Sequence, residues 1–190
     1  VGGTVVAGSP ELAEQLTWWA NCLGITGAPF DSYLTLRGVR TLHVRMRQHE
    51  ESAHLLANIL EEHAGVQRVY YPGLRSHPGH NIASRQQEGF GGMVSFELRG
   101  GPEAVRAFVE RLEFFSLAES LGGVESLVCH PASMTHAPVA REALARAGIG
   151  DNLVRLSIGL ESPEDLVADV LAALDAASGA AALTPVVAAV

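Results

Sequence analysis

The chain has 190 residues, of which 47% are apolar and 18% charged, and its formal net charge is −8. This balance is that of a globular protein with enough apolar residues to build a core. The arginines are scattered over an acidic chain, which disfavours a nucleic-acid partner. No apolar run approaches the roughly 20 residues of a membrane helix, so we expect no membrane partner. The two isolated cysteines, Cys22 and Cys129, fit a reducing compartment, and we expect a cytoplasmic protein.

The first third of the chain is predicted to contain one strand and two helices. Residues 4–7 form a short β-branched run, which is typical of a buried strand. Ser9, followed by a proline, is expected to cap a helix that ends at Gly24. Apolar residues at helical spacing predict a second, long helix over residues 29–63, with Gly38 as a point of bending.

Strands and helices are predicted to alternate through the rest of the chain. The strands are expected at residues 66–71, 92–98, 114–118 and 153–158. The helices are expected at residues 81–87, 102–112, 139–147 and 163–177. In the strand at 92–98, Val94, Phe96 and Leu98 alternate with more polar positions. Ser162 is expected to cap the last helix. The alternation is typical of an α/β fold.

Arg155 is the strongest candidate for a functional role. It lies among apolar neighbours in a predicted strand, where an unpaired guanidinium is costly to bury. Its planar fork suits a carboxylate held by two hydrogen bonds. The spacing by itself favours a structural ion pair with one of the 21 acidic residues, and a bound substrate carboxylate is the alternative.

A segment rich in turns and small residues, LAESLGGVESLVCHPASMTH at 117–136, holds three further candidates. Ser120 precedes paired glycines that let a backbone approach a ligand closely, although an ordinary turn explains them equally well. Glu119 is a candidate as the one carboxylate beside Ser120, and composition does not exclude an ordinary solvated carboxylate. Thr135 either orients a ligand or stabilises its own loop.

The histidines and cysteines do not predict a metal site. The local clusters are Cys129-His130 with His136, and His77 with His80. Neither has the spacing of a zinc site, so solvated or core histidines are the better interpretation and we expect no metal.

Several segments together resemble the pyridoxal-phosphate-dependent enzymes of cysteine and methionine metabolism. They are residues 117–136, Arg-Leu-Ser-Ile-Gly at 155–159, Trp-Trp-Ala-Asn at 18–21, Phe-Asp-Ser-Tyr-Leu at 30–34, Tyr-Pro-Gly-Leu at 71–74 and Gly-Phe-Gly-Gly-Met at 89–93. The resemblance extends from residue 1 to about residue 177. It implies the end of a fold-type I large domain at residues 1–45, which would bind the cofactor. A smaller α/β carboxy-terminal domain with a mostly antiparallel sheet would follow at residues 46–177, and then a frayed tail at residues 178–190.

The resemblance also implies roles for the candidate residues. Arg155 and Ser120 would bind the α-carboxylate of an amino-acid substrate, Glu119 would face its far end, and Thr135 would orient the cofactor region. The complete enzyme would replace the γ-substituent of an O-acylhomoserine with cysteine, giving cystathionine in methionine biosynthesis. Cleavage of cystathionine by a γ- or β-lyase is the alternative. The expected partners are the amino-terminal half of the same enzyme and further copies, in a homotetramer built from catalytic dimers.

The absence of lysine separates this chain from a complete enzyme of that family. All thirteen basic residues are arginine. The resemblance places the Schiff-base lysine that carries pyridoxal phosphate upstream of residue 1. We therefore expect no catalytic residue in this chain and assign no cofactor-binding residue. The chain alone is expected to be inactive, and an inert dimerisation fragment is the alternative to a part of the enzyme.

Overall fold

The computed structural model describes residues 2–183 and divides into two compact units, Val1–Val44 and Arg45–Val190. This division lies one residue from the boundary predicted at 45/46. The assignment of the first unit to a cofactor-binding domain stays a prediction.

The first unit contains helices α1 (Pro10–Leu23) and α2 (Pro29–Val39). The predicted ends of α1 are confirmed, because the Ser9 hydroxyl accepts a hydrogen bond from the backbone N–H of Leu12, and Gly24 closes the helix at a φ of 67°. The strand predicted at residues 4–7 is wrong, because this segment has no regular structure. A β-branched run forms a strand only beside a pairing strand, and the described residues place none there.

The long helix predicted over residues 29–63 is two helices. The first, α2, ends at Val39, and α3 (Leu42–Glu62) begins three residues later. The backbone N–H of Thr41 donates to the carbonyl of Gly38 at 3.3 Å, which closes the last turn of α2. Glycine costs about 1 kcal/mol relative to alanine inside a helix, which is consistent with an interruption near Gly38.

The second unit is built on one five-stranded sheet in the order β1-β2-β5-β4-β3. Its strands are β1 (Val66–Tyr70), β2 (Met93–Leu98), β3 (Ser116–Leu117), β4 (Leu127–Cys129) and β5 (Leu153–Ser157). All neighbouring pairs are antiparallel except β3 and β4, so the predicted mostly antiparallel α/β sheet is confirmed. We did not predict β4, because three residues are too few to show alternation.

Four more helices complete the second unit. They are α4 (His80–Gln86), α5 (Gly101–Arg111), α6 (Arg141–Arg146) and α7 (Pro163–Leu183). The cap predicted for α7 is confirmed, because the backbone N–H of Asp165 lies 3.5 Å from the Ser162 hydroxyl. The helix passes its predicted end at residue 177, since the alanines that follow are strong helix formers. The rest of the predicted tail, 184–190, lies outside the described residues. Across residues 2–183 no helix is both long and apolar enough to cross a membrane.

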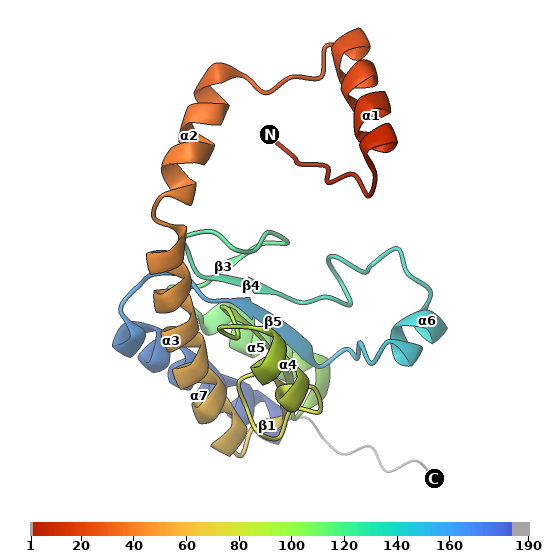
Figure 1. Cartoon of the computed structure of the whole chain (residues 1–190). Helices are drawn as coiled ribbons and strands as arrows, with labels where there is room; N and C mark the ends of the chain where they lie inside the picture. Colours follow the sequence, from red (N-terminus) through yellow and green to blue (C-terminus); the bar gives the residue numbers. More distant parts are fainter. Residues whose placement is uncertain (1, 184–190) are drawn as a thin grey trace. The chain divides into compact units, whose positions relative to one another are not determined.

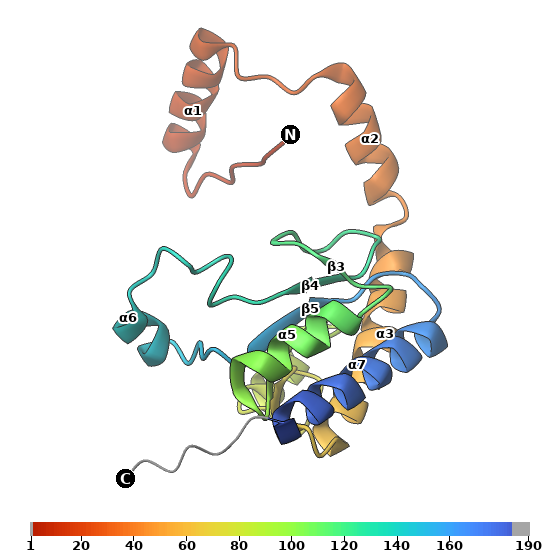
Figure 2. The same cartoon turned by 180° about the vertical axis from the view of Figure 1, so that it is seen from behind.

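The two faces of the sheet have different surroundings (Figures 1 and 2). One face packs with α3, α5 and α7 in a single apolar core, to which the strands contribute Val69, Val94, Phe96, Leu98, Val128, Val154 and Leu156. Phe96 meets Phe108 of α5 edge to face at 5.4 Å, a pair worth about 0.5–1.5 kcal/mol beyond its buried area. Because side chains alternate along a strand, Arg155 lies on the opposite face, away from these helices.

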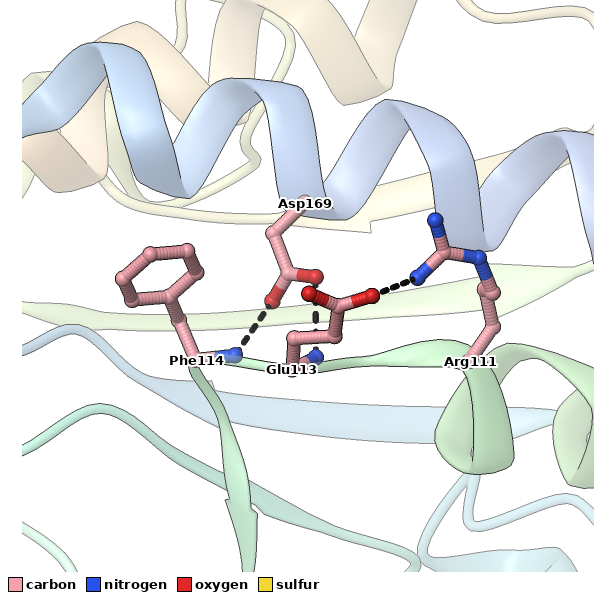
Figure 3. A network of polar contacts seen from close by, with 4 residues as sticks. All are labelled: Arg111, Glu113, Phe114 and Asp169. Atoms are coloured by element: carbon pink, nitrogen blue, oxygen red, sulfur yellow. Dashed lines mark hydrogen bonds and ion pairs between the residues drawn. The ribbon is translucent and has the colours of Figure 1, made fainter.

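A carboxylate of α7 fixes the chain where it enters β3 (Figure 3). Asp169 is only 6% exposed, and it accepts hydrogen bonds from the backbone N–H groups of Glu113 and Phe114, both at 2.9 Å. The Glu113 side chain in turn pairs with Arg111 at 2.7 Å. These bonds satisfy two backbone donors that the end of α5 leaves without sheet partners. The segment that leads toward the candidate site therefore starts from a fixed position.

Replacing Asp169 by asparagine should reduce the free energy of unfolding by about 1–3 kcal/mol. The substitution removes the charge and places an amide N–H₂ against one of the two backbone donors. Urea unfolding of the complete protein measures the loss. The matched control is Asp151→Asn, because Asp151 is exposed and meets Arg141 only at 3.9 Å, so its loss should stay within about 0.5 kcal/mol. Equal losses in the two variants would show that Asp169 does not hold the segment.

Candidate functional site

Arg155 lies at the middle of β5, opposite Ser95 of β2 and Cys129 of β4. Its side chain reaches the segment that follows β3, where Nη2 donates to the carbonyl oxygen of Glu119 at 2.9 Å and to that of Ser120 at 3.2 Å. Three of the four predicted site residues therefore meet, although they are about 35 positions apart in the chain. Arg155 contacts the other two through their backbone and not through their side chains.

The rest of the Arg155 guanidinium lacks a protein partner in the described part of the chain. Its Nε is buried and has no hydrogen-bond acceptor. None of the ion pairs found among residues 2–183 includes Arg155, so they do not support the structural ion pair that spacing favoured. A buried cationic donor without an acceptor is costly, and an anion is the group that would satisfy it. The arrangement can therefore bind a carboxylate.

The connection between β3 and β4, residues 118–126, carries Glu119 and Ser120. Parallel strands usually need a crossover of a dozen or more residues, so this short connection must leave the sheet and return sharply. Gly122 permits the turn because its φ is 75°, which side chains rarely adopt. The backbone N–H of Gly122 donates to the Ser157 hydroxyl at 2.8 Å, which ties the turn to β5.

The end of the same connection is tied to the chain that follows β5. The buried Ser126 donates twice to the Glu161 carboxylate, from its backbone N–H and from its hydroxyl, both at 2.8 Å. The Ser126 hydroxyl also accepts from the backbone N–H of Gly159 at 2.8 Å. A Cβ at Gly159 would lie 2.5 Å from the backbone nitrogen of Ser126, so only glycine fits this approach.

His49 of α3 holds the end of β5 from another direction. This buried side chain lies with Nδ1 2.7 Å from the carbonyl oxygen of Ile158 and 3.2 Å from that of Gly159. Because a carbonyl only accepts, Nδ1 must carry the proton. His49 is therefore a core histidine with its donor satisfied.

Thr135 is the predicted site residue that the structure does not bring to the others. Its hydroxyl lies 2.8 Å from Nδ1 of His136, and within residues 2–183 no hydrogen bond joins it to Arg155, Glu119 or Ser120. Its role toward a cofactor stays a prediction, as does the role of the exposed Glu119 carboxylate. No group of three or more His, Cys, Asp or Glu side chains in the described residues could hold a metal ion.

Sequence reasoning missed three residues that shape the site, Ser126, Ser157 and Glu161. A signal for two of them was present in the sequence. Arg155, Ser157, Gly159 and Glu161 are small or polar residues at every second position, and this pattern continues past the end of β5. It indicates one side of an extended segment whose partners are not apolar. Ser126 gave no such signal, since its neighbours resemble any turn.

Comparisons with known proteins extend over nearly the whole chain. Residues 1–175 match the family described as Cys/Met metabolism PLP-dependent enzyme. The chain is 51% identical to cystathionine γ-synthase of Escherichia coli, which covers 90% of this chain and 44% of that protein. It is 49% identical to cystathionine γ-lyase of Dictyostelium discoideum, over 92% of this chain and 45% of that protein. It is 50% identical to cystathionine β-lyase of Coxiella burnetii, over 92% of this chain and 45% of that protein.

A solved structure is also similar. It is cystathionine γ-synthase from Xanthomonas oryzae pv. oryzae in complex with aminoacrylate and cysteine, with a TM-score of 0.87 and 61% identity. The match covers 92% of this chain and 45% of that one, so the chain spans about half the length of the relatives it matches. The family match, the sequence identities and the shared fold agree with one another. This chain belongs to the family of pyridoxal-phosphate-dependent enzymes of cysteine and methionine metabolism.

Proposed function

We propose that the complete protein is a cystathionine γ-synthase, which replaces the γ-substituent of an O-acylhomoserine with cysteine. In this proposal the present chain contributes the site for the substrate's α-carboxylate. The observation that carries it is the state of Arg155, which two carbonyls orient while its buried Nε keeps an unused hydrogen-bond donor.

The orientation of the guanidinium matters for binding. Two backbone acceptors on Nη2 restrict rotation of the side chain, so a carboxylate that arrives meets donors already in place. Pre-ordering of this kind lowers the entropic cost of binding. It would also hold the amino-acid backbone of the substrate in one geometry while a bond at its γ-carbon is exchanged.

The choice of a synthase over a lyase rests on differences in sequence identity to known relatives. Identities of 51%, 49% and 50% to a synthase, a γ-lyase and a β-lyase do not separate these activities. The 61% identity to the Xanthomonas oryzae synthase supports the synthase. Cystathionine cleavage by a γ- or β-lyase is the second candidate, because these relatives are almost equally similar in sequence.

The test is a direct assay of the complete protein. A synthase forms cystathionine from an O-acylhomoserine and cysteine, and mass spectrometry detects this product. A lyase instead releases 2-oxobutyrate or pyruvate from cystathionine, which a coupled dehydrogenase assay measures. Release of a 2-oxo acid without cystathionine synthesis would replace the synthase by the corresponding lyase.

The residues of this chain do not fit covalent attachment of pyridoxal phosphate, since the chain contains no lysine. The cofactor supplies an electron sink for carbanions when it is bound. We propose that the lysine that holds it lies upstream of residue 1, and that this chain alone is inactive. The part that these residues take is to bind and orient the substrate.

The first unit supports the proposal that the amino-terminal half of the enzyme is a partner. Neither α1 nor α2 contains a buried residue, and Trp18, Trp19 and Phe30 are each more than half exposed. Large exposed apolar surfaces typically mark contacts with other protein surfaces. Assembly into a homotetramer and a cytoplasmic location remain part of this proposal.

A further inference from the structure

The connection at residues 118–126 depends on side chains for its shape. Its ends join the sheet through backbone bonds, in which Ala118 donates to Val128 and Ser116 donates to Ser126. Between these ends the neighbouring chain supplies one backbone bond, from the N–H of Leu160 to the carbonyl of Val124 at 2.8 Å, and several side-chain contacts. Arg155 binds the first carbonyls and Ser157 binds Gly122, and Glu161 binds the last residue. Three side chains from residues 155–161 thus hold one short segment at its beginning, middle and end.

Glu161 forms the most strongly bonded of these anchors. Both of its carboxylate oxygens accept from the fully buried Ser126, and hydrogen bonds to a charged acceptor are about twice as strong as neutral ones. Glu161 lies just before Ser162, the capping residue of α7, where the positive end of the helix dipole favours a negative charge. The two bonds from Ser126 hold the carboxylate, and the helix dipole favours its charge.

The sheet itself does not depend on Glu161. Strands β4 and β5 pair through Leu127 with Ser157, Val128 with Leu156 and Cys129 with Arg155. This ladder remains when the Glu161 carboxylate is removed. The connection keeps its backbone bond from Leu160 to Val124 but loses both bonds from Ser126 to the carboxylate, and this connection leads back to the Glu119 and Ser120 carbonyls that orient Arg155.

We propose that Glu161 is a positioning residue for substrate carboxylate binding, acting through Ser126 on the connection that orients Arg155. The inference rests on the proposed function of Arg155 and adds a residue that does not touch the substrate. Loss of Glu161 loosens the two carbonyls, so the guanidinium samples other orientations and the carboxylate binds more weakly. The reacting end of the substrate is affected less.

The test uses the complete protein with Glu161→Gln, a change that keeps the shape and removes the charge. The measured quantity is the ratio of kcat/KM for the amino-acid substrate to that for its methyl ester, in which the carboxylate charge is absent. We expect this ratio to fall about tenfold or more, mainly through KM of the free acid, as for loss of hydrogen bonds to a charged group. The inhibition constant of propionate, a simple carboxylate, should rise by a similar factor, and the absorbance of bound cofactor should stay the same.

Glu97→Gln is the matched control. Glu97 is also half-buried and accepts a hydroxyl hydrogen bond, from Tyr70 at 2.5 Å, but in the described part of the chain it makes no hydrogen bond to residues 118–126. Burial and this carboxylate both raise the pKa of Tyr70. The ratio in Glu97→Gln should match that of the unchanged protein. If Glu161→Gln does not fold, Ser126→Ala removes the hydroxyl bond to Glu161 and the bond accepted from Gly159, and it should lower the ratio in the same direction.

Arg155→Gln distinguishes failure of this inference from failure of the proposed function. If Arg155→Gln abolishes the preference for the free acid while Glu161→Gln and Ser126→Ala behave like Glu97→Gln, the positioning role is wrong and the proposed function stands. If Arg155→Gln keeps the preference, the proposed carboxylate site itself is wrong. When the carboxylate site and the positioning role are both right, the double variant Arg155→Gln/Glu161→Gln should lose no more of the preference for the free acid than Arg155→Gln alone.

Discussion

Substitution of Arg155 by glutamine should lower kcat/KM of the complete protein for its amino-acid substrate, with a loss of about 2–5 kcal/mol of transition-state stabilisation. This corresponds to a loss of roughly 30-fold to several thousandfold, which should come mainly from a higher KM. The physical reason is that the substrate carboxylate loses its only proposed cationic partner, at a position where the unused donor of Nε is buried. Steady-state kinetics with an O-acylhomoserine and cysteine measures the change.

Two further variants sharpen this result. Arg155→Lys keeps the charge but loses the planar fork that two carbonyls orient. Its activity should therefore lie between that of the Arg155→Gln variant and that of the unchanged protein. Arg106→Gln is the control, because Arg106 is exposed on α5 and its ion pairs among the described residues are with Glu103 and Glu110 of the same helix. Its kcat/KM should stay within about twofold, as for loss of surface ion pairs. If Arg155→Gln retained the same kcat/KM as Arg106→Gln, Arg155 would not bind the substrate.

Gly159→Ala should destabilise the complete protein by about 1–3 kcal/mol or more, as for overpacking of a filled site. The new methyl group would lie 2.5 Å from the backbone nitrogen of Ser126 and 2.6 Å from the carbonyl carbon of Glu125. Backbone atoms cannot rotate away, so the two segments must separate and the bond from Gly159 to the Ser126 hydroxyl must lengthen. Urea unfolding measures the loss of free energy.

The control for this substitution is Gly179→Ala. Gly179 lies inside α7, and a Cβ there would meet no atom within 4 Å. Alanine should stabilise this position by about 0.5–1 kcal/mol, because it restricts the unfolded chain and favours the helix. The two glycine-to-alanine changes should therefore have opposite signs. A Gly159→Ala protein as stable as the parent would mean that the two segments do not approach as closely as the structure places them.

The elements that the sequence predicted correctly are those fixed by interactions between residues close together in the chain. Ser9 and Gly24 end α1 through bonds to residues a few positions away, and the alternation of Val94, Phe96 and Leu98 reports directly which face of β2 is buried. The errors arose where the cause was distant. Residues 4–7 have the composition of a strand, but composition does not supply a pairing partner. Strand β4 is defined by its neighbours β3 and β5 and not by its own three residues.

The same distinction applies to the candidate site. Arg155 was predicted because a guanidinium on an apolar strand is unusual in itself. The roles of Ser126 and Glu161 depend on a bond between residues 35 positions apart, which no local pattern records. Ser120 was predicted for its hydroxyl, whereas the contact that the structure shows is made by its carbonyl. Backbone groups are present at every position, so sequence gives no sign of which one is used.

Because Arg155 is held by main-chain oxygens, the side chains at positions 119 and 120 can be exchanged without removing the atoms that orient it. In the proposed function, binding of the α-carboxylate is therefore separated from recognition of the substrate's side chain. Under this proposal, substitutions at neighbouring side chains can change the preferred substrate while the carboxylate site stays the same. This offers a physical reason why proteins with about half their residues identical to this chain carry out three different reactions.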